Sequence, residues 1–201
     1  MCLLVVLSRV HPDHPLVIAA NRDELLARAA TAMTVLRESG PRILGGRDEL
    51  AGGTWLAVNE HGVVAGLTNA PPGKNGRDAS KRSRGALPLR LAGHSRAAEA
   101  VAAFRDEVDS GDYNPCWMLC GDRQSLAYID LTVPATPVVE SLPPGIHILE
   151  NRPLHAPSPK ADAVRAALAG CERWRGDELL SALERILRDH AIPAGASEVP
   201  R

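Results

Sequence analysis

The sequence predicts an α+β fold built on antiparallel sheets. Apolar runs of strand length come in blocks, two pairs in the first half and four runs in the second, and the helical patterns form separate blocks. The paired runs are joined by short turns, which is typical of β-hairpins. The sequence has no strict strand–helix alternation, no Gly-x-Gly-x-x-Gly motif and no Walker loop, so a nucleotide-binding doubly wound fold is not expected.

The first half of the chain is predicted to contain two hairpins. Residues 2–10 and 16–22 are apolar, and the loop between them holds two prolines, which do not suit a strand interior. Residues 54–59 and 63–69 form a second pair joined by a turn that ends in glycine. Between the hairpins, residues 24–33 combine good helix formers, and we predict a helix there.

The second half begins with a polar, basic loop over residues 70–85. After it, Val101, Phe104 and Val108 lie on one face of a predicted helix. We predict helices over residues 85–92 and 95–109, strands over 115–121, 125–131, 136–141 and 145–150, and helices over 159–171 and 177–190. Residues 1–191 are then a single domain, and residues 192–201 a frayed tail without periodicity.

Composition narrows the class of protein. Lys plus Arg number 23 and Asp plus Glu number 24, a balance that argues against a nucleic-acid or membrane-surface binder. No apolar run approaches the roughly 20 residues that span a bilayer. The apolar run that starts at residue 3 is too short for a signal peptide, and no basic residue precedes it. We therefore expect a cytoplasmic protein whose partner is a small molecule; its oligomeric state is not predicted.

The four cysteines are expected to be thiols in a reducing compartment. Cys116 and Cys120 could suggest a metal pair. On a strand, however, their Cα atoms would lie ~13 Å apart, too far for one zinc ion with bonds of ~2.3 Å. The favoured interpretation is that both are small buried side chains, and no metal is expected.

Cys2 is the candidate nucleophile. Removal of Met1 would give Cys2 a free α-amino group with a reference pKa of ~7.7–8.0, next to its own thiol. One residue would then supply both nucleophile and base. The alternative is a structural cysteine on a strand, so the hypothesis depends on the residues around it.

Polar residues at the ends of three predicted strands are the candidate partners of Cys2. Arg22 and Asp23 end the second strand, and the first hairpin should bring them beside the N-terminus; the alternative is a weak surface ion pair. Asn69 ends the fourth strand and could donate a hydrogen bond to an oxyanion. Asn151 could do the same, or could be a turn residue before Arg152-Pro153.

The chain resembles a known family in several segments. These are Met1-Cys2 with the apolar strand after it, Ala19-Ala20-Asn21-Arg22-Asp23-Glu24, Gly52-Gly53-Thr54-Trp55-Leu56-Ala57-Val58-Asn59, Ala65-Gly66-Leu67-Thr68-Asn69, Ser83-Arg84-Gly85, Tyr113-Asn114, Leu149-Glu150-Asn151 and Pro159-Lys160. They are similar to segments of the NRDE family, the transport and Golgi organisation 2 family. Its members are similar to N-terminal-nucleophile (Ntn) hydrolases of the choloylglycine hydrolase and penicillin V acylase type.

The resemblance implies a four-layer αββα sandwich with two antiparallel sheets. It also implies a hydrolase of a non-peptide amide C–N bond with catalytic residues Cys2, Arg22, Asp23, Asn69 and Asn151, and without a cofactor. The Gly-Thr-Arg-containing strand and further hairpin of the relatives are not found before Arg201, so we expect either a sandwich that lacks those C-terminal strands or a chain that is truncated relative to the family.

A non-catalytic binding protein on the same fold is the second hypothesis. Family members have been connected with haem trafficking and with lipid or acyl-CoA metabolism. Haem would need a His or Cys ligand, but the spacing of the seven histidines singles out none. The basic residues between 74 and 84 could attract an anionic substrate, or simply form a solvated loop.

Overall fold

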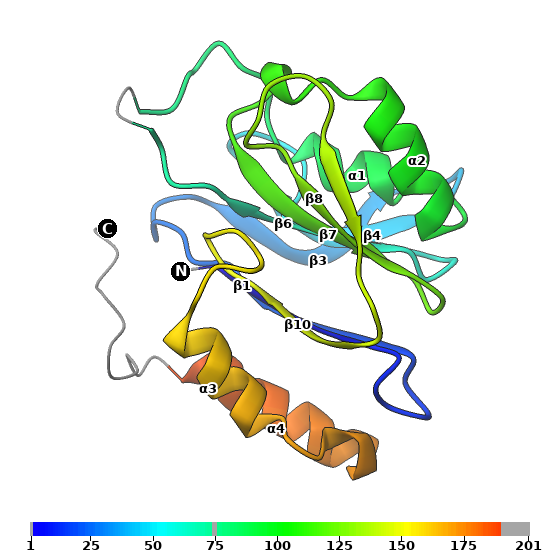
Figure 1. The fold of residues 1–201 in the computed structure, drawn as a ribbon. Coiled ribbons are helices and arrows are strands. Elements are labelled where there is room, and N and C mark those ends of the chain that lie inside the picture. Colours follow the sequence, from blue (N-terminus) through cyan, green and yellow to red (C-terminus); the bar gives the residue numbers. More distant parts are fainter. Residues whose placement is uncertain (1, 74–75, 190–201) are drawn as a thin grey trace.

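The computed structural model describes residues 2–73 and 76–189, which form four layers (Figure 1). The smaller sheet has the strand order β10 (Gly145–Leu149), β1 (Leu3–Ser8), β2 (Leu16–Asn21). The larger sheet has the order β3 (Ala30–Arg37), β4 (Ile43–Asp48), β5 (Leu56–Asn59), β6 (Val64–Asn69), β7 (Cys116–Gly121), β8 (Leu126–Asp130), β9 (Val138–Ser141). Every pair of neighbours in both sheets is antiparallel.

Two pairs of helices cover the outer faces of the sheets (Figure 1). The larger sheet is covered by α1 (Ala86–Leu91) and α2 (Ala97–Glu107), and the smaller by α3 (Pro159–Ala167) and α4 (Gly176–Arg188). The predicted αββα sandwich with antiparallel sheets is confirmed. None of the helices in the described part of the chain is long and apolar enough to cross a membrane.

The apolar runs fill the layers because side chains alternate along a strand. On β1, Leu3, Val5 and Leu7 pack with residues of α3 and α4. Leu4 and Val6 point the other way and pack against the larger sheet. Burial of both faces explains why β1 is a continuous apolar run and not an alternating one.

The same alternation settles the position of two cysteines. Cys116 and Cys120 lie on β7, as predicted, and face the layer of α1 and α2 together with Met118. Trp117 and Leu119 face the smaller sheet. Both thiols are fully buried in the outer core of the larger sheet.

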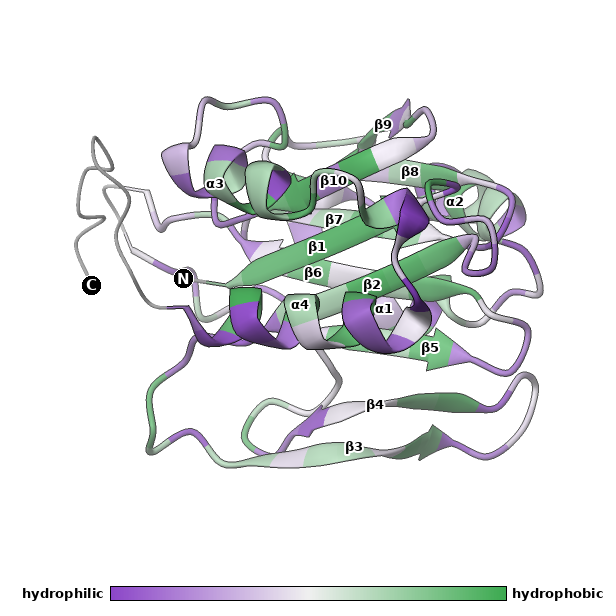
Figure 2. Cartoon of the chain, turned by 90° about the horizontal axis from the view of Figure 1, so that it is seen from below, coloured by the Kyte–Doolittle hydropathy of each residue, from purple (hydrophilic) through white to green (hydrophobic). Residues whose placement is uncertain are grey.

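The predicted helix over residues 24–33 is wrong. Residues 22–29 are irregular, and the chain then forms β3, which pairs with β4 at the edge of the larger sheet (Figure 2). Neither β3 nor β4 was predicted. The local helix propensity is overridden because pairing with β4 satisfies the backbone of residues 30–37, and Leu25 and Leu26 are left exposed.

The remaining predicted strands and helices are present with shifted ends. The largest shift is in the predicted helix over residues 159–171, which ends at Ala167 because Gly170 adopts a left-handed conformation with φ of 83°. Only a short 3₁₀ turn follows, over Cys171–Arg173. The predicted tail over residues 192–201 lies outside the described residues.

Candidate functional site

The first hairpin brings the predicted partners of Cys2 to one end of the smaller sheet. Leu3 of β1 pairs with Asn21 of β2, so Cys2 precedes one strand where Arg22 and Asp23 follow the other. The Sγ atom of Cys2 lies 3.7 Å from the backbone oxygen of Asp23, within reach of a weak S–H hydrogen bond.

Asn151 reaches Cys2 from the other side, because β10 also pairs with β1. Its Oδ1 accepts a hydrogen bond of 2.8 Å from the backbone nitrogen of Cys2. Its Nδ2 donates one of 2.7 Å to the backbone oxygen of Asn69, at the end of β6. The neighbouring Thr68 donates through Oγ1 to the backbone oxygen of Glu150 over 2.7 Å. These bonds fix the ends of the two sheets against each other at Cys2.

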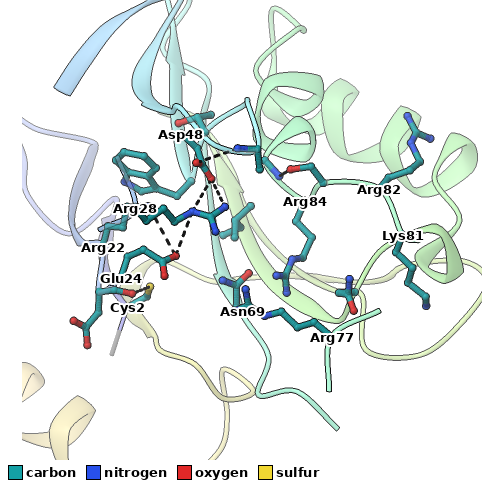
Figure 3. Close-up of a pocket in the computed structure, with 18 residues that line it drawn as sticks. Cys2, Arg22, Glu24, Arg28, Asp48, Asn69, Arg77, Lys81, Arg82 and Arg84 are labelled. Carbon is teal, nitrogen blue, oxygen red and sulfur yellow. Dashed lines mark hydrogen bonds and ion pairs between the residues drawn. The ribbon is translucent and has the colours of Figure 1, made fainter. Parts of the chain in front are cut away.

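A cavity of about 270 Å³ opens at this point (Figure 3). Four of the five predicted site residues line it, namely Cys2, Arg22, Asp23 and Asn69. Asn151 is not among the lining residues; it contacts Cys2 through the backbone nitrogen, outside the cavity lining. The other lining residues are Glu24, Arg28, Asp48, Ala51, Thr54, Trp55, Leu67, Arg77, Lys81, Arg82, Ser83, Arg84, Gly85 and Asn114.

A network of paired charges surrounds the thiol. The Nη2 atom of Arg22 lies 3.8 Å from Oε2 of Glu24. The guanidinium carbon of Arg22 stacks 4.8 Å from the centre of the Trp55 ring. Arg28 lies 3.7 Å from the same Glu24 and 2.6 Å from Asp48. No sequence pattern indicated Arg28 or Asp48, because the first was assigned to a helix and the second to a region without predicted structure.

The charges act in opposite directions on the Cys2 thiol. Burial raises its pKa above the ordinary value, and the negative charge of Glu24 adds to this effect. Arg22 and the side chain of Asn151 lower the pKa of the thiol and so oppose the increase. The thiol is therefore predominantly protonated near neutral pH, and it needs a base to act as a nucleophile.

The far wall of the cavity is cationic. It is formed by Arg77, Lys81, Arg82 and Arg84 of the basic loop. In Figure 3 the side chains of Arg77 and Arg84 point toward Asn69, whereas Lys81 and Arg82 point away. Arg82 lies 3.6 Å from Asp112 and stacks on Tyr113. The loop is thus partly packed, and its basic residues divide into two groups.

Two other polar residues, from the segments that resemble the family, form hydrogen bonds that stabilise the fold. Asn21 donates through Nδ2 to the backbone oxygen of Leu187 and so ties β2 to α4. Asn59 closes the turn between β5 and β6 by accepting from the backbone nitrogens of His61 and Val63. Among the described residues, no histidine lines the cavity and no group of three His, Cys, Asp or Glu could hold a metal ion.

Comparison with protein families gives a match to Transport and Golgi organisation 2 over residues 1–201. The chain belongs to the transport and Golgi organisation 2 family. The uncharacterized protein YGR127W of Saccharomyces cerevisiae is 34% identical over 96 residues, which is 44% of this chain and 30% of that protein. The match therefore spans less than a third of the yeast relative.

Solved structures of Ntn hydrolases share the fold. The N-acylethanolamine-hydrolyzing acid amidase orthologue of Caenorhabditis elegans has a TM-score of 0.68 and 13% identity, covering 96% of this chain and 88% of that chain. A single-residue variant of conjugated bile acid hydrolase from Clostridium perfringens has a TM-score of 0.52 and 15% identity, covering 87% of this chain and 58% of that chain. At these identities the likeness establishes the Ntn-hydrolase fold.

Proposed function

We propose that the protein is an N-terminal-cysteine amidohydrolase that cleaves a linear, non-peptide amide C–N bond after removal of Met1. One observation supports this most directly. The backbone nitrogen of Cys2 is held by Asn151 at 2.8 Å, while its thiol lines a cavity together with Asp23 and Asn69. Removal of Met1 would turn that held nitrogen into an amine next to the thiol.

The reaction then follows from the positions of these groups. The α-amine accepts the proton of the thiol, and the thiolate attacks the amide carbon. The C–N bond breaks as the ammonium group returns the proton to the leaving amine, which leaves a thioester on Cys2. Water, deprotonated by the same amine, hydrolyses the thioester and releases the carboxylic acid.

The partners have separate roles in this proposal. Asn69 lines the cavity and donates a side-chain N–H to the oxyanion of the tetrahedral intermediate. Asn151, engaged by both Cys2 and the backbone of Asn69, is a positioning residue. Arg22 stabilises the developing thiolate, and Asp23 orients the amine. Because burial raises the pKa of the Cys2 thiol, the thiol needs a base next to it, and the α-amine would supply one. A reducing cytoplasm would keep the thiol free.

Mass spectrometry of the intact protein tests the proposal. We expect loss of Met1 and, with an N-acyl 4-nitroanilide, a thioester on Cys2 that hydroxylamine removes. The Cys2→Ala variant should form no adduct, and Cys116→Ala should form it normally. A carrier protein would bind the acyl compound without forming a thioester. Retention of Met1, or an adduct on another cysteine, would overturn the proposal.

A further inference from the structure

We propose that Arg84 and Arg77 form a subsite for an oxyanion group, a carboxylate or a phosphate, on the substrate. This inference rests on the proposed function for the position of the amide at Cys2. The binding of the anion itself requires no catalysis and can be measured alone.

Charge is distributed unevenly in the cavity. On the Cys2 side, Arg22 and Arg28 have carboxylate partners, Glu24 and Asp48, within 4 Å. On the far side, neither Arg77 nor Arg84 forms an ion pair within residues 2–73 and 76–189. With Asp23, which also lines the cavity, three carboxylates and two arginines surround the thiol, and the opposite side has an excess of positive charge.

The backbone next to Arg84 is held in place at Gly85. The carbonyl oxygen of Gly85 accepts from the backbone nitrogen of Thr54 over 2.9 Å. A Cβ atom added to Gly53 would lie 2.4 Å from the Gly85 carbonyl carbon, so this contact requires glycine at 53. The segment that contains Arg84 is thus packed onto Gly52-Gly53-Thr54.

Within the part of the chain that the structure describes, the Arg84 side chain has N–H donors without a partner. One of its N–H groups, on Nη1, donates to the backbone oxygen of Pro115 over 3.1 Å. A guanidinium has five donors in a planar fork, and two of them can bind one carboxylate or phosphate. Since the Pro115 contact fixes the orientation of the side chain, the remaining donors are presented to the cavity with little further loss of conformational freedom.

The cations on the far side of the cavity repel one another. Burial lowers the pKa of Arg84, and the neighbouring charges of Arg77 and Arg28 lower it further. Like charges held together in a partly buried wall are unfavourable unless an anion joins them. A bound oxyanion would lie between the guanidinium groups of Arg84 and Arg77, which both point toward Asn69 (Figure 3).

A solvated basic loop is the competing explanation, and it fits only part of the loop. Arg82 is exposed, paired with Asp112 and directed away from Asn69. Arg84 also lines the cavity, but it is partly buried, points toward Asn69 and has no carboxylate partner among the described residues. These two arginines, two positions apart, therefore provide a matched pair for experiment.

The test compares three probes that share one acyl group: N-hexanoylglycine, N-hexanoylglycinamide and N-hexanoylaminomethylphosphonate. Binding is measured by calorimetry to the full chain with Cys2→Ala, which prevents turnover. We expect at least one anionic probe to bind about tenfold more tightly than the neutral amide, the scale of one charged hydrogen-bonded contact. The ratio between the two anionic probes distinguishes carboxylate from phosphate recognition.

Variants assign the effect to residues. Arg84→Gln, in the Cys2→Ala background, should reduce the preference to about twofold or less, and Arg77→Gln should reduce it partly. Arg82→Gln removes the same charge from the same loop and should retain the preference. If Arg84→Gln fails to fold, Arg84→Lys keeps the charge without the planar fork and should weaken the preference.

Three outcomes would each overturn the subsite. The anionic and neutral probes could bind equally, none of the three probes could bind, or the preference for the anionic probes could fall equally in Arg82→Gln and Arg84→Gln. The amidohydrolase proposal is tested separately by the thioester on Cys2 in protein with an intact thiol. Preferential anion binding without any thioester would retain the subsite and overturn the hydrolase. A thioester without preferential anion binding would retain the hydrolase and overturn the subsite.

Discussion

Cys2 and Cys116 carry the same side chain in different surroundings, and the two thiols differ in burial and in pKa. Both lie at strand ends near Asn69, since Cys116 pairs with Asn69 across β6 and β7. Cys116 faces the helix layer and is fully buried, and burial raises the pKa of its thiol to about 12. Cys2 is half-buried and lines a cavity, and Arg22 partly offsets the effect of burial on its pKa. The direction of the side chain, and not its position along the strand, separates a packing cysteine from a candidate nucleophile.

The largest expected difference between the two thiols is in chemical accessibility. Iodoacetamide should label Cys2 in the native protein roughly 10³-fold faster than Cys116 or Cys120, because the latter react only after the core opens. Peptide mass spectrometry over time measures each rate. Labelling of all three at similar rates under native conditions would contradict the comparison.

Replacing Asn69 by Ala should remove the proposed oxyanion donor from the cavity that the Cys2 thiol lines. We expect kcat for an amide substrate to fall about 10²- to 10³-fold, with iodoacetamide labelling of Cys2 nearly unchanged. Asn114→Ala, at another position lining the cavity, is the control and should lower kcat far less. A drop in labelling equal to the drop in kcat would indicate that Asn69 supports the thiol and not the oxyanion.

Serine substitutions should distinguish the structural thiols from Cys2 by stability. Cys120→Ser places a hydroxyl in a fully buried apolar layer, and we expect the free energy of unfolding to fall by about 1–3 kcal/mol. Cys2→Ser should change it by less than about 0.5 kcal/mol. Urea denaturation followed by tryptophan fluorescence gives both values. A larger loss at position 2 would mean that Cys2 is mainly a packing residue.

The smallest expected effect concerns the charges around Cys2. The carboxylate of Glu24 raises the pKa of the Cys2 thiol, so Glu24→Gln should lower that pKa and increase the thiolate fraction at neutral pH. Labelling of Cys2 at pH 7 should accelerate by less than about tenfold. Arg22→Gln should act in the opposite direction, because Arg22 lowers the pKa. Glu60→Gln, in the turn between β5 and β6, should leave the rate unchanged.

Much of the Cys2 side of the site could be predicted because hairpin pairing is local. The register of β1 and β2 follows from two apolar runs and a short loop, and it places Arg22 and Asp23 beside Cys2. The hydrogen bonds of Asn151 could not be predicted. They depend on β10 pairing with β1 across more than a hundred residues and on the contact of that end with β6.

The edge hairpin marks the limit of local reasoning. Residues 24–33 favour a helix by propensity, yet β3 begins at Ala30 because β4 provides a partner for its backbone. That change also places Arg28 against Asp48 in the cavity wall. Two charged residues of the site were therefore missed for the same reason as the two strands.

The sequence by itself determined the antiparallel hairpins and the position of Cys2 at a strand start, because alternation and turn chemistry act over a few residues. The four-layer arrangement was expected only from the resemblance to the family. The tertiary structure decided which charges are paired. Glu24 and Asp48 meet Arg22 and Arg28, while Arg84 is left facing the cavity. Charge pairing across a cavity depends on how distant segments pack, and no spacing along the chain encodes it.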